Sequence, residues 1–319
     1  MRHFSPVYQP ELFPFLQSDR IVNVSSVPQR SPFRYPGGKT WLIPYIRQWL
    51  THFKKRPSCL IEPFAGGATV GLTAGFEGLA ERVILVELDQ QVAAVWQTIL
   101  GGEAEWLVER ILNFHLTIEN VILSLSRVDH ADLRERAFCT LLKNRTYHGG
   151  ILAPGASLIK NGENGKGIAS RWYPDTLARR IMAIDKIKDR FEFICGDGVE
   201  ILKNYANEKN IVFFIDPPYT IGGGNNKRAG KRLYAHNEVD HDQLFKIAHQ
   251  CTGQVLMTYD DNFDTKTLAD RYNFSTKNIS MKNTHHSKLS ELIISKNLEW
   301  CAPPITPAHR PAPFPVPDH

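Results

Sequence analysis

The run Ile211–Tyr219 constrains the fold more than any other stretch of the chain. Its first part is β-branched and aromatic, which predicts a strand buried on both faces. The strand must end at Asp216-Pro217-Pro218-Tyr219, because neither proline can donate a ladder hydrogen bond and each fixes its own φ. In open α/β sheets, ligands bind at that end of a strand. The carboxylate, carbonyls and ring suit a planar group that carries an amine, although a strand followed by an ordinary proline turn explains the same residues.

A second group of motifs lies in the first third of the chain. Cys59–Phe64 predicts a short buried strand, and Ala65–Leu72 places glycines between that strand and a helix, where a ligand can approach the backbone closely. A further strand, Arg82–Glu87, ends in an acid where dinucleotide-binding folds commonly hold a ribose diol. The loop and the acid together indicate an adenosine-type cofactor. The alternative for Glu87 is an acid at a helix N-terminus, which is the interpretation that we prefer for Asp89.

The segment Ser31–Thr40 reads SPFRYPGGKT and predicts a tight turn ahead of a helix over residues 39–52. Its ending is similar to a phosphate-binding P-loop, but that pattern needs a glycine where this chain has Phe33. A nucleoside triphosphatase is therefore not expected. The plain alternative is a glycine turn that leaves Lys39 as a solvated lysine in the first turn of the helix.

A third strand is predicted at Phe191–Cys195, and Gly196-Asp197-Gly198 follows it. Asp197 is thus placed to accept a hydrogen bond from an adenine amino group, although a turn-forming aspartate between glycines is a strong alternative. Helices separate most of the predicted strands, which indicates one doubly wound α/β sheet, and the last two strands are expected to form a hairpin. The strands are expected near residues 60, 84, 193, 213, 256, 275 and 293.

Between the second and third strands the sheet pattern disappears. Residues 143–172 are rich in Gly, Asn, Lys and Arg and are too long for a short α/β connection, so they predict an inserted, basic, partly irregular subdomain. Such residues suit contacts with phosphates and bases, whereas a solvated flexible loop explains the same composition. The candidates are Lys143, Arg145, Lys160, Lys166 and Arg171 for phosphates, and Asn144, Tyr147 and His148 for bases.

A glycine-rich basic segment, residues 222–232, follows the tetrapeptide and contains Lys227 and Arg228. A lid that a polyanion orders fits this composition, and so does a plain disordered loop.

Composition excludes some classes of protein. The chain has 319 residues, of which 42% are apolar, but it contains no run of about 18 apolar residues that would cross a membrane. Its five cysteines are scattered without a C-x-x-C pair, which fits a reducing cytoplasm and disfavours a disulfide framework or a metal site. The N-terminus lacks the apolar stretch of a secretory signal. A net charge of +5 permits nucleic-acid binding without requiring it.

Five motifs in register carry a resemblance to a known family: Arg34-Tyr35-Pro36-Gly37-Gly38-Lys39, Glu62-Pro63-Phe64-Ala65-Gly66-Gly67, Glu87, Gly196-Asp197 and Asp216-Pro217-Pro218-Tyr219. Over residues 31–295 the chain resembles the Dam-like DNA adenine-N6 methyltransferases. The resemblance implies a Rossmann-like fold that uses S-adenosylmethionine, with a target-recognition subdomain inserted between a cofactor half and a catalytic half.

The resemblance also assigns roles. Tyr35 and Lys39 are similar to the family's N-terminal cofactor contacts, and Phe64, Ala65 and Gly66 to its cofactor loop. Glu87 stands where the family often has an aspartate on the ribose, and Asp197 where an acid meets the cofactor's adenine. Asp216, Pro217, Pro218 and Tyr219 resemble the catalytic tetrapeptide, and Asp216 also borders the cofactor. The implied DNA contacts are Lys143, Asn144, Arg145, Tyr147, His148, Lys227 and Arg228.

The implied activity is methylation of a flipped adenine in double-stranded DNA, in a restriction-modification, orphan or phage-defence setting. The family's usual recognition hairpin is only loosely matched at Lys143–Gly150, so the target GATC is not assumed. An S-adenosylmethionine-dependent enzyme that acts on RNA or another amine is one alternative, and a non-catalytic DNA-binding member of a larger defence complex is another. We expect a cytoplasmic monomer or weak dimer with no membrane contact, and a protein partner in a restriction or defence system is conceivable.

The expected domains are an extended arm over residues 1–30, a methyltransferase domain from residues 31–105 and 190–300, a recognition insertion over residues 106–189, and a proline-rich tail over residues 301–319.

Overall fold

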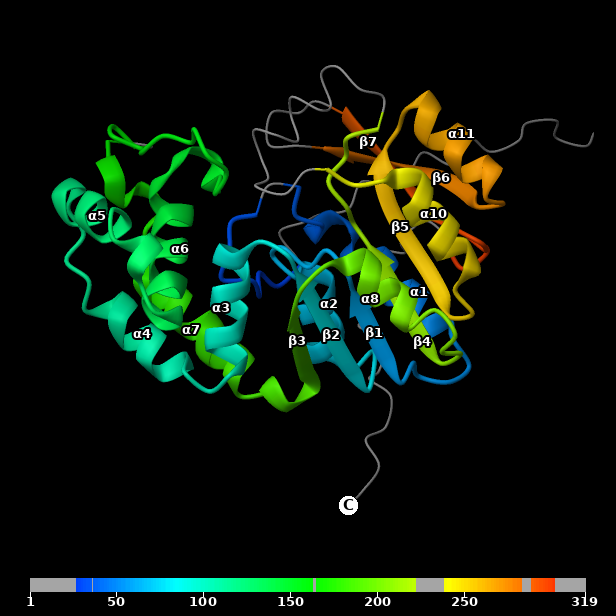
Figure 1. Cartoon of the computed structure of the whole chain (residues 1–319), viewed down its shortest axis with the longest axis horizontal. Helices are drawn as coiled ribbons and strands as arrows, with labels where there is room; N and C mark the ends of the chain where they lie inside the picture. Colours follow the sequence, from blue (N-terminus) through cyan, green and yellow to red (C-terminus); the bar gives the residue numbers. More distant parts are fainter. Residues whose placement is uncertain (1–26, 36, 163–164, 222–237, 283–287, 302–319) are drawn as a thin grey trace, which may run out of the picture.

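A single sheet of seven strands forms the centre of the computed structural model, and five of its strands run parallel (Figure 1). The order across the sheet is β3-β2-β1-β4-β5-β7-β6, and the last two strands form an antiparallel hairpin. The strands are β1 (Cys59–Glu62), β2 (Arg82–Glu87), β3 (Phe191–Cys195), β4 (Ile211–Ile215), β5 (Gln254–Asp260), β6 (Ser275–Lys282) and β7 (Lys288–Ser295). The predicted Rossmann-like sheet with its final hairpin is thereby confirmed.

The structure describes residues 27–35, 37–162, 165–221, 238–282 and 288–301. Most of the predicted N-terminal arm, the basic segment with Lys227 and Arg228, and the proline-rich tail after residue 301 lie outside these ranges. Within these ranges, none of the helices combines the length and the hydropathy that crossing a bilayer requires.

The strand order fixes where a ligand can bind. β1 pairs with β2 on one side and with β4 on the other, so the chain builds outward from β1 in one direction and then reverses at β4. Doubly wound sheets bind ligands in the crevice beside the carboxyl ends of the strands at such a reversal. The tetrapeptide after β4 and the glycine loop after β1 therefore lie next to each other.

Alternating residues of the central strands feed two separate cores. Leu60, Leu85 and Phe214 belong to the core under α1, α2 and α3, whereas Ile61 and Phe213 belong to the core under α8, α10 and α11. Every residue of β1 and β4 is buried, as their continuous apolar sequences predict. The covering helices are α1 (Ile43–His52), α2 (Thr69–Glu77), α3 (Gln90–Leu100), α8 (Gly198–Asn204), α10 (His241–Gln250) and α11 (Phe263–Arg271).

Between α3 and β3, the described residues form a lobe of four α-helices beside the β3 edge of the sheet (Figure 1). Within it α6 packs along α3, and α7 packs against α4. The insertion is more regular than its composition predicts, because α6 continues to Thr146 and so includes the first part of the predicted irregular stretch. The lobe helices are α4 (Ala104–Leu112), α5 (Ile118–Leu125), α6 (Leu133–Thr146) and α7 (Pro174–Asp185).

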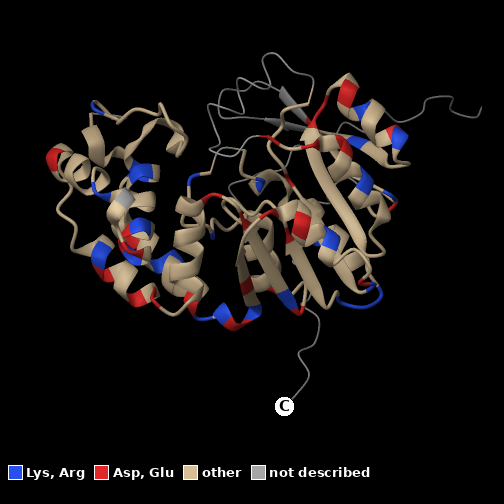
Figure 2. Ribbon diagram, viewed as in Figure 1, with Lys and Arg blue, Asp and Glu red and all other residues tan. Residues whose placement is uncertain are grey.

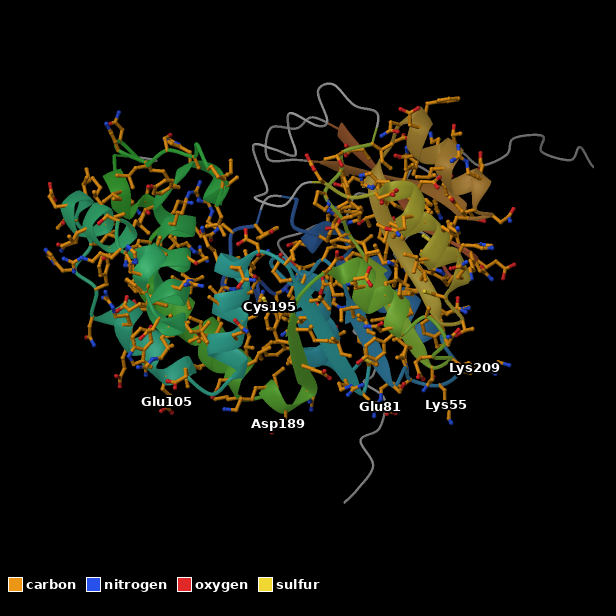
Figure 3. The ribbon with its side chains drawn as sticks, in the orientation of Figure 1. Lys55, Glu81, Glu105, Asp189, Cys195 and Lys209 are labelled. Carbon is orange, nitrogen blue, oxygen red and sulfur yellow. The ribbon has the colours of Figure 1, made fainter. Side chains whose placement is uncertain are left out.

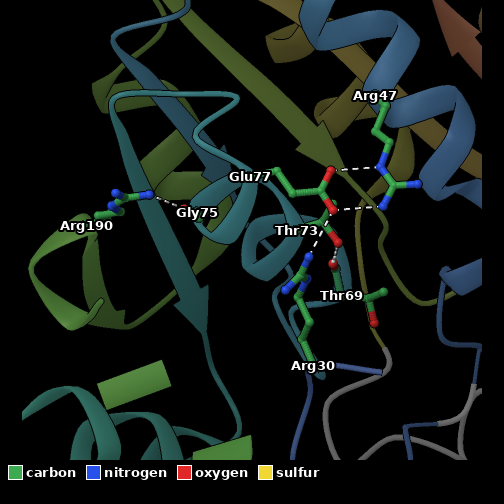
Figure 4. A network of polar contacts seen from close by, with 7 residues as sticks. All are labelled: Arg30, Arg47, Thr69, Thr73, Gly75, Glu77 and Arg190. Carbon is green, nitrogen blue, oxygen red and sulfur yellow. Dashed lines mark hydrogen bonds and ion pairs between the residues drawn. The ribbon is translucent and has the colours of Figure 1, made fainter. Parts of the chain in front are cut away.

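An ion-pair network fixes α2, the helix that starts at the glycine loop (Figure 4). Glu77 lies at the C-terminus of α2, where the helix dipole disfavours a carboxylate. Two arginines offset this penalty. Arg47 of α1 binds both Glu77 oxygens at 2.7 Å, and Arg30 donates to Oε1 at 2.9 Å. All three side chains are less than one-fifth exposed, so solvent screens the pairs only partly.

Burial acts to raise the pKa of Glu77, but the hydrogen bonds and charges of Arg47 and Arg30 outweigh it, and the net shift is downward from 4.5. Because the folded pKa is lowered, ionised Glu77 stabilises the fold above the ordinary carboxyl pKa. This contribution disappears as the pH falls through the lowered value.

We expect Glu77→Ala to lower the free energy of unfolding by about 2 kcal/mol at neutral pH, because it leaves two partly buried guanidinium groups without their carboxylate. The difference from wild type should shrink as the pH falls through the lowered pKa of Glu77, where the wild-type carboxylate is itself protonated. Urea unfolding across this pH range measures both effects. Arg271→Ala is the control, because its ion pair with Asp242 is more than half exposed and should be worth less than about 1 kcal/mol. Equal losses in the two variants would contradict the expectation.

Candidate active site

A pocket lies at the carboxyl ends of β1, β2 and β4, at the point where the strand order reverses. Figure 3 labels Lys55, Glu81 and Lys209 near the opposite edge, just before these strands begin. All eight residues that the resemblance assigns to the cofactor lie in the pocket lining, so the structure brings them together. They are Tyr35, Lys39, Phe64, Ala65, Gly66, Glu87, Asp197 and Asp216.

Carboxylates dominate the charge of this pocket. Among the described residues that line it, Lys39 is the only basic side chain, and eight are acidic. Such a lining favours a cationic ligand and repels a polyphosphate, which agrees with the absence of a P-loop pattern. The acids are Glu62, Glu87, Asp89, Asp197, Glu200, Asp216, Glu238 and Asp240.

The glycine loop after β1 is held in one shape by contacts from three directions. Gly66 has φ +47°, and a Cβ there would lie 2.6 Å from the ring of Tyr35, so the ring lies directly on the backbone. The Gly66 amide donates to Glu87 Oε2 at 2.8 Å, and the Trp96 indole donates to the Gly66 carbonyl at 2.9 Å. Only glycine fits this combination of φ and contact, and the loop is therefore preorganised.

The two acids at the end of β2 have different roles, since Glu87 holds the glycine loop and Asp89 caps α3. Glu87 accepts hydrogen bonds from the amides of Gly66 and Asp89 and lines the pocket, and burial raises its pKa to about 7. Asp89 caps α3 by accepting from the Gln91 amide at 2.8 Å, which confirms its interpretation as a helix N-terminal acid. Glu87 is thus the acid that the loop itself orients.

Asp197 has a local partner as well as a place in the pocket lining. It caps α8 by accepting from the Val199 amide at 2.7 Å, as its alternative interpretation as a turn residue expects. Its side chain is nevertheless exposed toward the pocket. The next residue, Gly198, lies so close to β1 that a Cβ would come within 2.0 Å of the Pro63 carbonyl oxygen. The tip of β3 is therefore held against the glycine loop.

The tetrapeptide after β4 forms a tight polar cluster. Asp216 Oδ1 accepts hydrogen bonds at 2.7 Å from both the Tyr219 and the Thr258 hydroxyls. The Tyr219 hydroxyl also lies 3.3 Å from Glu291 Oε2, and its ring stacks on Tyr259 with centroids 5.6 Å apart. Of the four predicted catalytic residues, Asp216 and Pro218 line the pocket, Pro217 is buried, and Tyr219 lies in the wall behind Asp216.

Lys39 is buried rather than solvated, so its plain interpretation as an exposed first-turn lysine is wrong. Only 4% of it is exposed, and its ammonium lies 3.0 Å from Asp216 Oδ2 and 3.6 Å from Glu291 Oε2. It also donates to the Gly37 carbonyl at 2.7 Å and lies over the Tyr219 ring. The N-terminal glycine turn therefore supplies the positive charge that pairs with Asp216 of the tetrapeptide.

The sequence analysis did not identify three acids near Lys39 as site residues, namely Glu62, Asp260 and Glu291. Burial raises the pKa of Glu62 well above its ordinary value although the carboxylate accepts the Gly71 amide, and the pKa of Asp260 is raised for the same reason. Burial also raises the pKa of Glu291 to about 7. The signal that was present for Glu291 is an acid directly before the apolar run Leu292–Ile294.

A neutral histidine supports the aromatic side of the cluster. His241 Nε2 lies 2.8 Å from the Thr220 hydroxyl and His241 Nδ1 lies 3.0 Å from the Tyr259 hydroxyl. Burial lowers the pKa of His241 to about 4, so its imidazole is uncharged at neutral pH. Thr220 and His241 thereby hold the ring on which Tyr219 stacks.

Two of the predicted DNA contacts have structural roles in the lobe, and their assignment as direct contacts needs correction. Asn144 is fully buried, where it accepts from the Arg34 amide and donates to the carbonyls of Arg34 and Gly150. Arg145 is 5% exposed and donates to the Pro32 carbonyl, and burial lowers its pKa to about 9. Both residues clamp the N-terminal segment onto α6, because the helix turns them inward.

The remaining predicted contacts differ in exposure. Lys143 is half-buried and donates to the Leu152 carbonyl at 2.6 Å, and Tyr147 is also half-buried, whereas His148 is exposed. Lys160 and Lys166 are exposed farther along the lobe. Figure 2 shows basic and acidic residues interspersed on the helices of the lobe.

Comparison with known proteins agrees with this site. The chain is 27% identical to the DNA N-6-adenine-methyltransferase of Escherichia phage P1 over 210 residues, which are 63% of this chain and 25% of that protein. It therefore spans about a quarter of the length of this relative.

Two solved structures align with most of the chain. A proposed RNA methyltransferase from Pyrococcus horikoshii gives a TM-score of 0.35 at 11% identity, with 85% of this chain and 87% of that one covered. A proposed class I S-adenosylmethionine-dependent methyltransferase from Listeria monocytogenes gives 0.35 at 14% identity, covering 82% and 61%. Scores this low carry no argument, and the fold class follows from the sheet order described above.

A family model described as D12 class N6 adenine-specific DNA methyltransferase matches residues 35–286, well over half of the chain. The matched range begins at Tyr35, whose ring lies on the glycine loop, and it includes β4 and β5, the strands before and after the tetrapeptide. The chain belongs to the D12 class N6 adenine-specific DNA methyltransferase family.

Proposed function

We propose that the chain methylates N6 of adenine at specific sites in double-stranded DNA, with S-adenosylmethionine as methyl donor. The observation that carries the proposal is the position of Asp216–Tyr219, at the carboxyl end of β4 and in contact with the same acidic pocket as the glycine loop. Family membership and the phage P1 relative support the choice of adenine and DNA.

The residues present fit S-adenosylmethionine. This cofactor carries positive charge on its sulfonium and amino groups and one negative charge on its carboxylate, and its net positive charge suits a pocket with eight acids and one lysine among its described lining residues. Gly66 leaves its backbone open to close approach, and the oriented Glu87 carboxylate can accept from a ribose diol. We therefore assign cofactor binding to the eight predicted residues, with Asp197 toward the adenine end and Asp216 toward the methyl end.

When bound, the cofactor supplies an electrophilic methyl group. The target adenine has to leave the base stack to reach it, at a few kcal/mol. Asp216 and the Pro217 carbonyl would accept hydrogen bonds from the amine and turn its lone pair out of conjugation with the ring. Tyr219, supported by Tyr259, would lie against the base. Positioning and fixed charge provide most of the acceleration in this arrangement.

We assign recognition of the DNA target to the helical lobe within residues 106–189, and catalysis to residues 31–105 and 190–300. Asn144 and Arg145 would then act indirectly, by holding the segment that carries Tyr35 and Lys39. His148, Lys160 and Lys166 are exposed on the lobe and take the role of direct contacts. The biological setting, the oligomeric state and a protein partner stay predictions.

The proposal is tested by sequencing DNA from cells that express the chain with a method that detects modified bases. N6-methyladenine at one recurring sequence is the expected result. Methylation found only in RNA, or at cytosine, would replace the proposed substrate, and unmodified nucleic acid would favour a non-catalytic DNA-binding role.

Asp216→Ala should reduce methyl transfer to DNA by on the order of 10³-fold, because it removes the acceptor that orients the amine. Binding of S-adenosylmethionine should remain measurable by calorimetry, since the glycine loop and Glu87 are unchanged and Glu291 still pairs with Lys39. Asp264→Ala, an exposed acid in the first turn of α11, is the matched control and should keep full activity. Wild-type rates in Asp216→Ala would remove the tetrapeptide from the mechanism.

Lys160→Ala should flatten the dependence of log K on log salt for DNA binding by about one counterion, because the exposed lysine would neutralise one phosphate. Lys55→Ala is the control, since Lys55 is exposed near the edge of the sheet that faces away from the pocket (Figure 3). Binding isotherms at several salt concentrations measure both slopes. An unchanged slope in Lys160→Ala would show that Lys160 does not contact phosphate and would favour the interpretation of that segment as a solvated loop.

A further inference from the structure

The Tyr219 hydroxyl lies between two carboxylates from different parts of the sheet, Asp216 directly after β4 and Glu291 in β7. It donates to Asp216 Oδ1 at 2.7 Å and also lies 3.3 Å from Glu291 Oε2. Glu291 is held in this position by the pairing of β7 with β5, where it faces Asp260 in register, and only 9% of it is exposed. A continuous hydrogen-bonded path therefore runs from the pocket-lining Asp216 to a buried acid behind it.

Charged groups surround Glu291 on each element that packs against it. Lys39 lies 3.6 Å away, Asp216 and Tyr219 approach from the tip of β4, and Asp260 from the end of β5. Burial together with Asp216 and Asp260 raises the pKa of Glu291 to about 7, although Lys39 opposes the shift. Glu291 can therefore exchange a proton at neutral pH.

Methyl transfer to an amine produces a proton that must leave. The nitrogen lone pair forms the new N–C bond while the S–C bond breaks with its electrons on sulfur, and the nitrogen then holds one hydrogen too many. Asp216 is the first acceptor in reach, but taking up the proton would break its ion pair with Lys39, whose ammonium lies 3.0 Å away. A second acceptor behind Asp216 would restore that ion pair after each turnover.

We propose that Glu291 is this second acceptor and takes up the amine proton through the Tyr219 hydroxyl. Asp216 passes the proton to the Tyr219 oxygen while Tyr219 passes its own hydrogen to Glu291 Oε2, so Asp216 returns to the carboxylate and Glu291 becomes neutral. The inference rests on the proposed methyltransferase function. In this proposal Glu291 receives the proton through Asp216 and Tyr219 and touches neither the base nor the cofactor. We therefore call it a positioning residue and keep the term catalytic for Asp216 and Tyr219.

Other buried groups in the described site are less suited to this role. The Glu62 carboxylate is committed to the Gly71 amide at 2.7 Å. His241 has its two ring nitrogens hydrogen-bonded to Thr220 and Tyr259, and its pKa near 4 keeps it neutral. Glu291 combines contact with the Tyr219 hydroxyl and a pKa in the working range.

The test uses Glu291→Gln, Tyr219→Phe and the double variant in single-turnover methylation with saturating S-adenosylmethionine. Wild-type enzyme should lose activity as the pH falls below about 7, because Glu291 must be ionised to accept a proton. Each single variant should be slower by on the order of a hundredfold and should lack this acid limb. The double variant should be no slower than either single one, since both interrupt the same path.

A second readout does not depend on activity. Because the pKa of Glu87 is also about 7, the spectra are recorded in a Glu87→Gln background. In cofactor-free protein, infrared difference spectra should show a neutral carboxyl band that titrates near pH 7 in Glu87→Gln, that is missing when Glu291→Gln is added, and that persists when Glu62→Gln is added instead. Thermal melts of the variants show whether they are folded.

Two results overturn the inference: an acid limb that persists in Glu291→Gln, or a band titrating near pH 7 that survives Glu291→Gln in the Glu87→Gln background. If instead wild-type protein methylates no DNA at any pH, the proposed function fails, and the inference fails with it.

Discussion

The buried ammonium of Lys39 is the interaction on which the rest of the site depends. A charge that is 4% exposed is tolerated only when it is paired, and removal of one partner from such a pair typically costs several kcal/mol. Asp216 and Glu291 provide the partners, from the ends of β4 and from β7. Because Lys39 also donates to the Gly37 carbonyl, this pairing fixes the N-terminal glycine turn over the sheet. The turn in turn carries Tyr35, whose ring lies on Gly66.

The lobe contributes to the same arrangement from the opposite side. Asn144 and Arg145 bind the backbone at Arg34 and Pro32, so α6 holds the segment whose far end is Lys39. The lobe is thereby connected through one short stretch of backbone to the charge that balances Asp216, and on the proposed function this links DNA recognition to the pocket. Hydrogen bonds hold one end of this segment on α6 and an ion pair holds Lys39 at the other end, which gives the insertion a structural role in the pocket whether or not it contacts a base.

The sequence predicted those parts of the fold that depend on local pattern. Apolar runs identified β1 and β4, and the acid of Asp89 identified the start of α3. Six of the eight predicted pocket residues came from motifs at strand ends, and Tyr35 and Lys39 came from the glycine turn ahead of α1. The sequence did not predict burial that depends on tertiary packing. The sequence left Lys39 between a cofactor contact, which the resemblance implies, and a solvated lysine, because its carboxylate partners lie far along the chain. Asn144 and Arg145 looked like nucleic-acid contacts, because composition does not show which face of α6 turns inward. Glu291 belonged to no recognised motif, and it is the pairing of β7 with β5 that brings it to Asp216.

On the proposed function, the hydrogen bonds of Asp216 also define what must happen at the site when the amine of the target base arrives. Both of its oxygens are already engaged, Oδ1 by the Tyr219 and Thr258 hydroxyls and Oδ2 by Lys39. An incoming amine therefore exchanges with one of these donors. Such an exchange is nearly neutral in free energy, because one hydrogen bond replaces another, provided that the displaced group finds a new partner. The Tyr219 hydroxyl has that partner in Glu291 at 3.3 Å, whereas the Thr258 hydroxyl is fully buried. Tyr219 is thus the donor that can yield, and Glu291 is the acceptor that makes this possible without leaving a buried hydroxyl unsatisfied.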